Sequence, residues 1–334
     1  MPSPQTTIKT TTAIVRAAHD GVLKIRDVEL PETPPTHVVV EVRAIGLCRT
    51  DFYAIEGKIP TKPGDLIPGH EFAGVVHCAD PSQQANGLRV GDHVVVNPVV
   101  PCGECSDCQN SQQHCCAQTR FMGVDLEGAC CEHVIVPASA CHVVPKTMPF
   151  EVAAFSEPVA ATTSILKADL KHEDHGLLIG DGRIAELAKR VLIADGFDQI
   201  QYSTLEQAEQ LESDKFDFVI EAALSTKVLN EMVRLVRPRG KLILKSRQYE
   251  PVQWSARDVI GKEPNIRMVN YGRFEDAVSL LVENRVRVDD LVGQTFALEQ
   301  FAEAFEHARM AEGCLLYTSP SPRDATLSRM PSSA

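Results

Sequence analysis

The chain has 334 residues, which is enough for about two domains. Hydrophobic residues make up 44% of it, and no apolar run approaches the ~20 residues that a membrane-spanning helix needs, so the composition indicates a soluble globular protein. Because 45 acidic residues face 33 basic ones and give a formal charge of −12, nucleic acids and anionic membrane surfaces are disfavoured as partners.

Residues 10 to 150 predict a mostly β domain. Short runs of β-branched and other apolar residues alternate with proline and glycine, which is typical of strands joined by turns. The strands are predicted at Thr12–Arg16, Val38–Ile45, Phe72–His77, Asp92–Asn97, Cys131–Pro137 and Cys141–Pro145.

The loops between these strands contain one set of possible metal ligands. Cys48 follows the second predicted strand, and Gly69-His70-Glu71 leads into the third. Glu157, far downstream, could complete the set. A combination of one thiolate with nitrogen and oxygen donors is typical of catalytic zinc sites.

Four cysteines later in this domain form a second and chemically different set. They are Cys102, Cys105, Cys108 and Cys116. Four thiolates at this spacing can close around one tetrahedral Zn²⁺ and leave no position for a substrate. We therefore expect a structural zinc here and a catalytic zinc at the first set.

The cysteine count also indicates a compartment. Eleven cysteines, with no hydrophobic leader behind Met1, predict a reducing, cytoplasmic location, where clustered thiols bind metal more often than they form disulfides. The spacing leaves out Cys115, Cys130 and Cys131, and we expect these three to be small core residues.

The pattern changes near residue 150, where helices begin to alternate with buried strands. Glu151–Leu170 is predicted to be helical, and the following elements indicate βαβ units and a parallel sheet. They are the strand Gly176–Gly180, a helix through Ile193, the strand Phe216–Ala222, the helix Thr226–Val236, a turn at Pro238–Gly240 and the strand Lys241–Lys245, with a further helix at Phe301–Arg309.

The first of these units contains a glycine turn, Gly180-Asp-Gly182-Arg-Ile-Ala185. After a strand and before a helix, such a turn lets the backbone approach a dinucleotide pyrophosphate at the helix N-terminus. The candidate cofactor-binding residues are Gly180, Gly182, Arg183, Ile184 and Ala185. A tight turn without a ligand is the alternative.

Taken together, Gly46-Leu-Cys48-Arg-Thr50-Asp51, Gly69-His70-Glu71, the four-cysteine lobe, Ser156-Glu157-Pro158 and the glycine turn resemble the zinc-containing medium-chain dehydrogenases. This family includes alcohol, sorbitol and threonine dehydrogenases, and the resemblance covers roughly residues 10 to 310. It implies an α/β fold with a GroES-like catalytic domain, a Rossmann-type coenzyme domain and an active site in the cleft between them. It also implies a homodimer or homotetramer.

The same resemblance assigns roles to individual residues. Cys48 and His70 would bind the catalytic zinc directly, and Glu71 and Glu157 would share the remaining positions with water. Thr50 matches the family's proton-relay hydroxyl, and Arg49 matches a position that can pair with the coenzyme pyrophosphate. Tyr53 stands where many members carry the next relay group, a histidine, so solvent or the cofactor ribose could serve instead.

The coenzyme half departs from the family pattern. No acid stands near Tyr202-Ser203-Thr204, where a carboxylate usually binds the adenine ribose of NAD, and no arginine stands there for NADP. The choice between NAD and NADP is therefore open. The interval from Gly180 to Phe216 is about a dozen residues shorter than the family usually shows, so we expect a helix or strand of the adenosine-binding half to be missing. Glu221-Ala-Ala-Leu224 also lacks the glycine that the family often has after this strand.

These observations predict the following organisation. Residues 8–155 form the GroES-like domain, with the zinc lobe at about 98–118; residues 156–290 form a shortened Rossmann domain; and residues 291–313 return to the first domain. Residues 315–334 lack any pattern and resemble translated sequencing-adapter read-through, so we expect them to be a non-native tail lying outside the fold, and the family's final strand to be missing.

Two functions are consistent with this sequence. The first is a zinc-dependent NAD(P) oxidoreductase acting on a secondary alcohol or polyol, with two zinc ions per chain. The second is a catalytically silent member of the same fold that binds or regulates, as the shortened coenzyme half and the missing ribose acid would allow. The substrate itself is not encoded in any motif.

Overall fold

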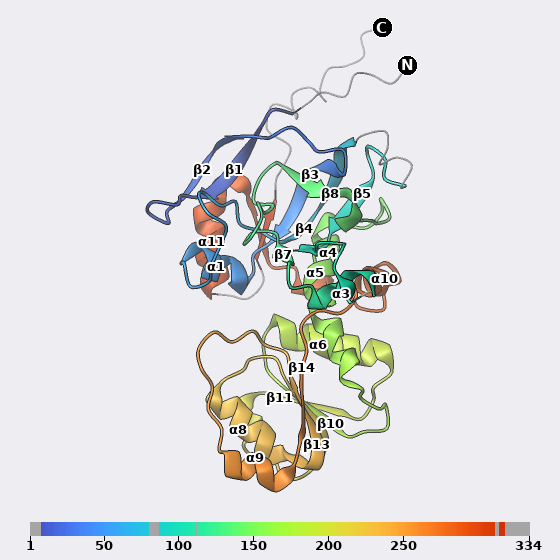
Figure 1. The fold of residues 1–334 in the computed structure, drawn as a ribbon. Coiled ribbons are helices and arrows are strands. Elements are labelled where there is room, and N and C mark those ends of the chain that lie inside the picture. Colours follow the sequence, from blue (N-terminus) through green and yellow to red (C-terminus); the bar gives the residue numbers. More distant parts are fainter. Residues whose placement is uncertain (1–7, 80–86, 111, 311–313, 318–334) are drawn as a thin grey trace. The chain divides into compact units, whose positions relative to one another are not determined.

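The computed structural model describes residues 8–79, 87–110, 112–310 and 314–317 (Figure 1). The chain divides into two compact units, of which unit 1 comprises Met1–Phe155 and Val292–Ala334, and unit 2 comprises Ser156–Leu291. No helix in the described parts of the chain is long and apolar enough to cross a bilayer.

Unit 1 is built on a seven-stranded sheet with the order β15-β16-β3-β4-β5-β9, in which β8 also pairs with β3. The antiparallel pairs β1-β2 and β6-β7 form two further, two-stranded sheets. The strands are β1 (Thr10–Arg16), β2 (Leu23–Glu29), β3 (His37–Gly46), β4 (Glu71–Ala79), β5 (His93–Val96), β6 (Val99–Val100), β7 (Arg120–Phe121), β8 (His133–Pro137), β9 (Cys141–Val143), β15 (Gln294–Ala297) and β16 (Cys314–Tyr317). All six strands predicted for residues 10 to 150 are therefore present.

Short helices connect these strands. They are α1 (Arg49–Ile55), α3 (Ser106–Gln109), α4 (Phe150–Ala153) and α11 (Phe301–Met310), with the 3-10 turns η1 (Gln113–Cys115), η2 (Ala138–Ala140) and η5 (Leu298–Gln300). Helix α11 confirms the predicted helix at Phe301–Arg309 and packs Phe305 edge-on against Phe52 of α1, with ring centroids 5.7 Å apart.

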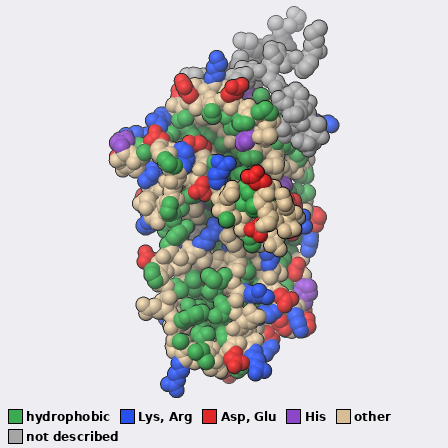
Figure 2. Space-filling model, viewed as in Figure 1, with side chains coloured by type: hydrophobic (Ala, Val, Ile, Leu, Met, Phe, Trp, Pro, Cys, Tyr) green, Lys and Arg blue, Asp and Glu red, His purple; other side chains and the backbone are tan. Residues whose placement is uncertain are grey.

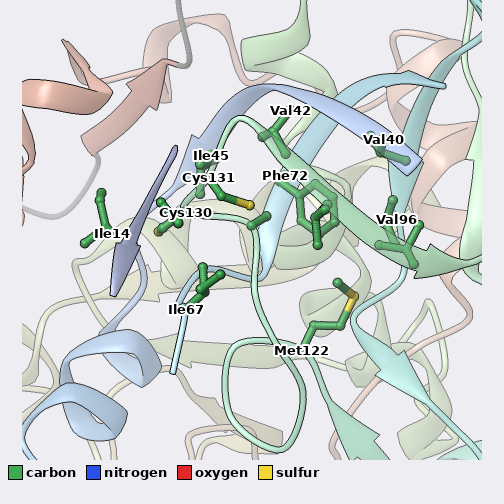
Figure 3. Packing of buried hydrophobic residues seen from close by; sticks show 14 of the residues in the cluster. Ile14, Val40, Val42, Ile45, Ile67, Phe72, Val96, Met122, Cys130 and Cys131 are labelled. Atoms are coloured by element: carbon green, nitrogen blue, oxygen red, sulfur yellow. The ribbon is translucent and has the colours of Figure 1, made fainter. Parts of the chain in front are cut away.

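The core of unit 1 fixes the ends of β3 and β4. Val40, Val42 and Ile45 of β3 and Phe72 of β4 are buried together with Met122, as Figure 3 shows. A fully buried side chain of this size contributes about 1.5–3 kcal/mol. Because β3 and β4 pair antiparallel with Gly46 opposite Glu71, the segments that follow β3 and precede β4 emerge at the same end of the sheet.

The C-terminal boundary of the fold differs from the prediction. Leu315, Leu316 and Tyr317, which we expected in a structureless tail, belong to β16, which pairs parallel with β15 and antiparallel with β3. The expectation that no final strand returns to the first domain is therefore wrong. Only four residues are needed here, because the open edges of β3 and β15 supply the backbone hydrogen-bonding partners. Residues 318–334 lie outside the described residues.

Unit 2 is a five-stranded parallel sheet with helices beside it. Its strands are β10 (Gly176–Ile179), β11 (Ile200–Ser203), β12 (Phe216–Glu221), β13 (Val236–Leu244) and β14 (Asn265–Met268). Its helices are α5 (Ser156–Thr163), α6 (Arg183–Asp195), α7 (Leu205–Ala208), α8 (Thr226–Leu235), α9 (Ala256–Lys262) and α10 (Phe274–Val282), with the 3-10 turns η3 (Ser164–Ala168) and η4 (Asp289–Leu291). Leu177 and Leu178 are buried in different clusters, so both faces of the sheet are covered.

The strand order locates the shortening that the sequence predicts. The order is β11-β10-β12-β13-β14, whereas a six-stranded dinucleotide-binding sheet has the order 3-2-1-4-5-6. Strand β10 therefore corresponds to strand 1 and β11 to strand 2, and the place of strand 3 beyond β11 is empty in this fully described unit. A single helical turn, α7, connects β11 back to β12.

The predicted turn at Pro238–Gly240 lies inside a strand. Between the first and second aligned pairs of β12 and β13, the register moves from Phe216 opposite Val236 to Phe218 opposite Lys241. The extra residues form a bulge in which Arg239 has a positive φ of 61°. The proline and glycine thus mark a local irregularity rather than the end of a strand.

Candidate active site

Three of the predicted ligands lie together at one end of the main sheet of unit 1. One ligand atom from each of Cys48, His70 and Glu71 lies within 4.8 Å of the others. Cys48 precedes α1, His70 precedes β4, and Glu71 is the first residue of β4. His70 and Glu71 are buried, whereas Cys48 is partly exposed.

Two glycines allow this close arrangement. A side chain at Gly46, which faces Glu71 across the β3–β4 pair, would overlap the Glu71 carboxylate. Gly69 has a φ of 100°, and a Cβ there would lie 2.8 Å from the Sγ atom of buried Cys130. Both positions therefore need glycine for the ligands to reach this geometry.

Asp51 orients the set. Its buried carboxylate accepts hydrogen bonds from the backbone N–H of Cys48 at 2.9 Å and of Gly69 at 3.0 Å. Its Oδ1 also lies 3.0 Å from Nδ1 of His70. A proton on Nδ1 is favoured by this carboxylate, which leaves Nε2 as the nitrogen for a metal.

The carboxylate of Asp51 also affects the pKa of His70. Burial lowers the pKa of His70, but the charge and hydrogen bond of Asp51 outweigh it, so the pKa lies well above its ordinary value. A zinc ion would bind the neutral imidazole and displace the proton. The sequence motif contains Asp51, but sequence reasoning gave it no role.

The four lobe cysteines also lie together. Their Sγ atoms are all within 4.8 Å of one another. Cys102 Sγ is 3.5 Å from Cys116 Sγ and 3.9 Å from Cys108 Sγ, and Cys105 Sγ is 3.5 Å from Cys108 Sγ. Zn–S bonds of about 2.3 Å in a tetrahedron require sulfur atoms about 3.8 Å apart, so this spacing fits one zinc ion.

Backbone donors favour thiolates in the lobe. The N–H of Cys102 lies 3.5 Å from Cys116 Sγ and, as the largest cause, lowers the pKa of Cys116 to about 6. Burial raises the pKa of Cys108 to about 12. Because these thiols cannot all ionise easily side by side, a cation is the group that would hold all four as thiolates.

The glycine turn of unit 2 lies at the carboxyl end of the parallel sheet. Gly180 follows β10 with a φ of 153°, and a Cβ there would lie 3.0 Å from Cβ of Ala185 and 3.1 Å from Cβ of Ala222. Gly182 precedes α6, whose 13 residues begin at Arg183. The chain continues from β10 to β11 on one side and later to β12 on the other, so the turn stands at the switch point of the sheet, where dinucleotides bind in this architecture.

Comparison with known proteins decides the family. Residues 34–146 match the alcohol dehydrogenase GroES-like domain. The chain is 31% identical over 238 residues to D-altritol 5-dehydrogenase of Agrobacterium fabrum, which covers 64% of this chain and 70% of that protein. It is also 26% identical over 314 residues to the starvation-sensing protein RspB of Escherichia coli K12, which covers 84% of this chain and 91% of the relative.

The chain belongs to the zinc-containing medium-chain dehydrogenases. The fold agrees. The crystal structure of an RspB alcohol dehydrogenase from Escherichia coli CFT073 complexed with NADH superposes with a TM-score of 0.80 at 23% identity, covering 93% of this chain and 100% of that one.

Three further residues to which the family resemblance gave a role, Arg49, Thr50 and Tyr53, lie on α1. Thr50 Oγ1 lies 4.0 Å from Cys48 Sγ, close to the ligands. Arg49 is exposed on the same helix. Tyr53 packs beside a small apolar cluster, with Lys58 Nζ 5.6 Å from the centre of its ring. The roles of all three stay predictions.

The three cysteines that we expected to be core residues differ in burial. Cys130 and Cys131 are confirmed as buried core residues and are labelled in Figure 3. The expectation for Cys115 is wrong, because its side chain is exposed. Cys115 ends the single turn η1, and the chain there directs the next residue, Cys116, into the lobe.

Glu157 lies in unit 2, and the structure shows its contacts within that unit. It lies in the first turn of α5 and is buried, and the hydroxyl of Tyr271 donates a hydrogen bond to its Oε1. Burial raises the pKa of Tyr271 well above its ordinary value, and the negative charge of Glu157 raises it further. Sequence reasoning missed Tyr271.

No acid stands at Ser203 or Thr204, at the end of β11. At the end of β11 Ser203 is buried, and Thr204 begins α7 by accepting a hydrogen bond from the N–H of Gln207 at 3.4 Å. Arg183 and Ile184 stand half-buried in the first turn of α6. At the end of β12, Glu221 accepts hydrogen bonds from the backbone N–H of Lys245 at 2.6 Å and of Ser246 at 2.8 Å.

Proposed function

We propose that this protein is a zinc-dependent NAD(P) oxidoreductase that transfers a hydride between a nicotinamide and a secondary alcohol or polyol, or the corresponding ketone or aldehyde in reverse. The observation that carries the proposal is the meeting of Cys48, His70 and Glu71 within 4.8 Å, with Nδ1 of His70 held by Asp51. Sulfur, nitrogen and oxygen donors at this spacing fit a catalytic zinc.

Cys48 and His70 are the ligands in this proposal, and Glu71 and Glu157 are the carboxylates that share the remaining positions. Zinc bound there supplies a Lewis acid, which makes the substrate hydroxyl more acidic and so favours departure of the hydride to the nicotinamide. Cys102, Cys105, Cys108 and Cys116 hold a second, structural zinc whose four thiolates leave no position for substrate.

The proton of the substrate hydroxyl leaves through Thr50. Its Oγ1 stands 4.0 Å from Cys48 Sγ and can accept that proton while giving up its own. Tyr53 offers no basic nitrogen as the next acceptor, so water or the cofactor ribose takes the proton further.

The N-terminus of α6 would hold the coenzyme pyrophosphate. Gly180 would let the backbone approach it, the N–H groups of Gly182 to Ala185 would donate to it, and Arg49 would pair with its charge. The adenosine end carries neither an acid for a ribose hydroxyl nor an arginine for a 2′-phosphate at Ser203 and Thr204, so both NAD and NADP are candidates.

The proposal extends to location and assembly. We expect a cytoplasmic homodimer or homotetramer. Unit 2 exposes several large apolar side chains, a feature that supports self-association. On the face shown in Figure 2, hydrophobic side chains gather on this unit, while acidic and basic ones are interspersed elsewhere. The most exposed large apolar side chains of the unit are Met268 on the edge strand β14 and Ile260 on α9.

The test is spectrophotometric. Zinc-loaded protein is mixed with NAD⁺ or NADP⁺ and a panel of secondary alcohols and polyols, and the absorbance of the reduced nicotinamide is followed. We expect turnover with at least one alcohol, and loss of that turnover in His70→Ala. No turnover with any pair, together with no binding of either coenzyme, contradicts the proposal.

A catalytically silent binding protein of the same fold is the second candidate. The missing third strand of the coenzyme sheet and the absent ribose acid favour it, because both remove contacts to the adenosine half. It predicts one retained lobe zinc and no thermal shift with either coenzyme, whereas the oxidoreductase predicts stabilisation by the coenzyme it binds.

A further inference from the structure

The half of unit 2 that would receive the adenosine of a dinucleotide is incomplete. A dinucleotide-binding sheet consists of two mononucleotide-binding halves, and strands 1, 2 and 3 form the adenosine half. Here β10 and β11 take the places of strands 1 and 2, and no strand lies beyond β11 in this fully described unit. The other half is complete, since β12, β13 and β14 take the places of strands 4, 5 and 6.

The segment that replaces the missing strand is packed onto the sheet. Leu205 and Leu211 pack against the apolar cluster between the sheet and α8, and Ala208 is fully buried. The guanidinium of Arg234 on α8 donates to the carbonyl of Ala208 at 2.9 Å and to that of Leu211 at 2.7 Å. Residues 204–215 therefore form a fixed connection from β11 to β12.

The polar side chains at the end of β11 bind to one another. Ser203 is buried, and its Oγ accepts a hydrogen bond from Nε2 of Gln201 at 3.4 Å. Thr204 and Gln207 form a capping box, in which the N–H of Thr204 donates to Oε1 of Gln207 at 2.9 Å and the N–H of Gln207 donates to Oγ1 of Thr204 at 3.4 Å. None of these side chains carries the charge that would select a ribose hydroxyl or a 2′-phosphate.

The charged side chains beside this end of the sheet are engaged within unit 2. Nζ of Lys189 on α6 lies 5.2 Å from the centre of the Tyr202 ring and 3.7 Å from Oε2 of Glu186. Glu206 is exposed in the first turn of α7, where its own backbone N–H, followed by the hydroxyl of Thr204, lowers its pKa. Its charge therefore stabilises the start of its own helix.

The elements for the pyrophosphate and the nicotinamide are retained. Gly180 and the N-terminus of the 13-residue helix α6 form the turn at the switch point of the sheet. Glu221 accepts hydrogen bonds from the N–H of Lys245 at 2.6 Å and of Ser246 at 2.8 Å, which ties the carboxyl ends of β12 and β13 together. The contacts that unit 2 can offer to a coenzyme thus lie on its phosphate and nicotinamide side.

We propose that this chain binds its coenzyme through the nicotinamide mononucleotide and pyrophosphate parts and makes no selective contact with the adenosine, so that it accepts NAD, NADP and nicotinamide mononucleotide. The inference rests on the proposed function, because it takes a nicotinamide coenzyme as the ligand of unit 2. A hydrogen bond to a charged group contributes a factor of roughly ten to one hundred in affinity, and neither dinucleotide gains this factor at the end of β11.

Calorimetric titration of the purified, zinc-loaded chain tests this without a substrate. The ligands are NAD⁺, NADP⁺ and two mononucleotides that each carry one phosphate, nicotinamide mononucleotide and AMP. We expect the Kd values of NAD⁺ and NADP⁺ to agree within about fivefold, and nicotinamide mononucleotide to bind at least about tenfold more tightly than AMP. A larger preference for either dinucleotide overturns the inference, and so does a smaller difference between the two mononucleotides.

Two variants locate the contacts. Gly182→Asp puts a negative charge at the N-terminus of α6; the φ of −89° at Gly182 suits other residues, and aspartate is a favourable N-cap, so we expect the helix to form. It should weaken binding of NAD⁺ and of nicotinamide mononucleotide together, by about tenfold. Glu206→Gln should leave all affinities unchanged. A loss of NAD⁺ affinity in Glu206→Gln, or a Gly182→Asp variant in which the two affinities do not fall together, overturns the inference.

Failure of the proposed function gives a different result. In that case neither dinucleotide binds and nicotinamide mononucleotide does not bind either, which overturns the oxidoreductase proposal and the inference with it. Tight binding of one dinucleotide with a strong preference over the other leaves the proposed function standing and overturns the inference alone.

Discussion

At the scale of single residues, the geometry of the candidate zinc ligands depends on Asp51. Its carboxylate is shared between His70 Nδ1 and the N–H groups of Cys48 and Gly69, so it fixes both the imidazole and the backbone next to the thiol. In Asp51→Asn one oxygen becomes a donor that faces other donors. We predict zinc affinity at this site about 10- to 100-fold lower, measured by chelator competition.

The control is Asp198→Asn, at an exposed carboxylate on the surface of unit 2. It should leave zinc affinity unchanged. An equally unchanged affinity in Asp51→Asn would show that Asp51 does not orient His70.

Site residues could be predicted from the sequence where they stand close to one another along the chain. Cys48, His70 and Glu71 could be recognised because donor types and neighbouring glycines form short motifs. Asp51 was not assigned, because an acid three residues after Cys48 is equally typical of a helix N-terminus. Tyr271 could not be found, since it meets Glu157 across 114 residues with no pattern linking them.

At the scale of secondary structure, strand β8 carries a histidine whose titration affects stability. Burial, followed by the positive charges of His77 on β4 and Arg43 on β3, lowers the pKa of His133 to about 4. The rings of His77 and His133 are 5.2 Å apart, and Glu41 stands opposite His133 in the β3–β8 register, paired with Arg43 at 2.9 Å.

The free energy of unfolding depends on pH because the folded and the unfolded chain take up the His133 proton at different pH values. Between about pH 6.5 and pH 4 the unfolded chain protonates His133 while the folded protein does not, so the free energy of unfolding falls as pH falls through this window. Allowing for solvent screening of a partly exposed group, the contribution is about 1–2 kcal/mol. Denaturant unfolding of wild type and His133→Gln at pH 7 and pH 4.5 measures it.

We expect the wild type to lose more stability between these two pH values than His133→Gln does. His19→Gln, at a side chain 74% exposed, serves as the control. Equal losses in wild type and His133→Gln would contradict the prediction.

Elements were predictable where burial imposed a pattern. Strands β3 and β4 have strong apolar runs and were found, whereas β2, with mostly exposed or half-exposed residues, was not. Strand β16 was missed for a different reason. Its four residues carry no pattern of their own, and they pair only because β3 and β15 offer open edges, which is a property of the assembled sheet.

At the scale of the whole molecule, the sequence predicted a mostly β part and a part with a parallel sheet, and the structure shows both, in unit 1 and unit 2 respectively. The shortened interval after Gly180 predicted the loss of a helix or strand in the adenosine-binding half. Topology places it beyond the edge strand β11, whereas β10 and β12 flank the switch point, so the switch point and the glycine turn remain complete. The reduction therefore affects the adenosine side of the sheet.

The central claim is that this one chain holds two zinc ions of different kinds, and elemental analysis of the purified protein tests it most directly. The account predicts two zinc ions per chain in the wild type and one in His70→Ala, with the remaining ion held by the four lobe cysteines. One zinc per chain in both proteins would contradict it.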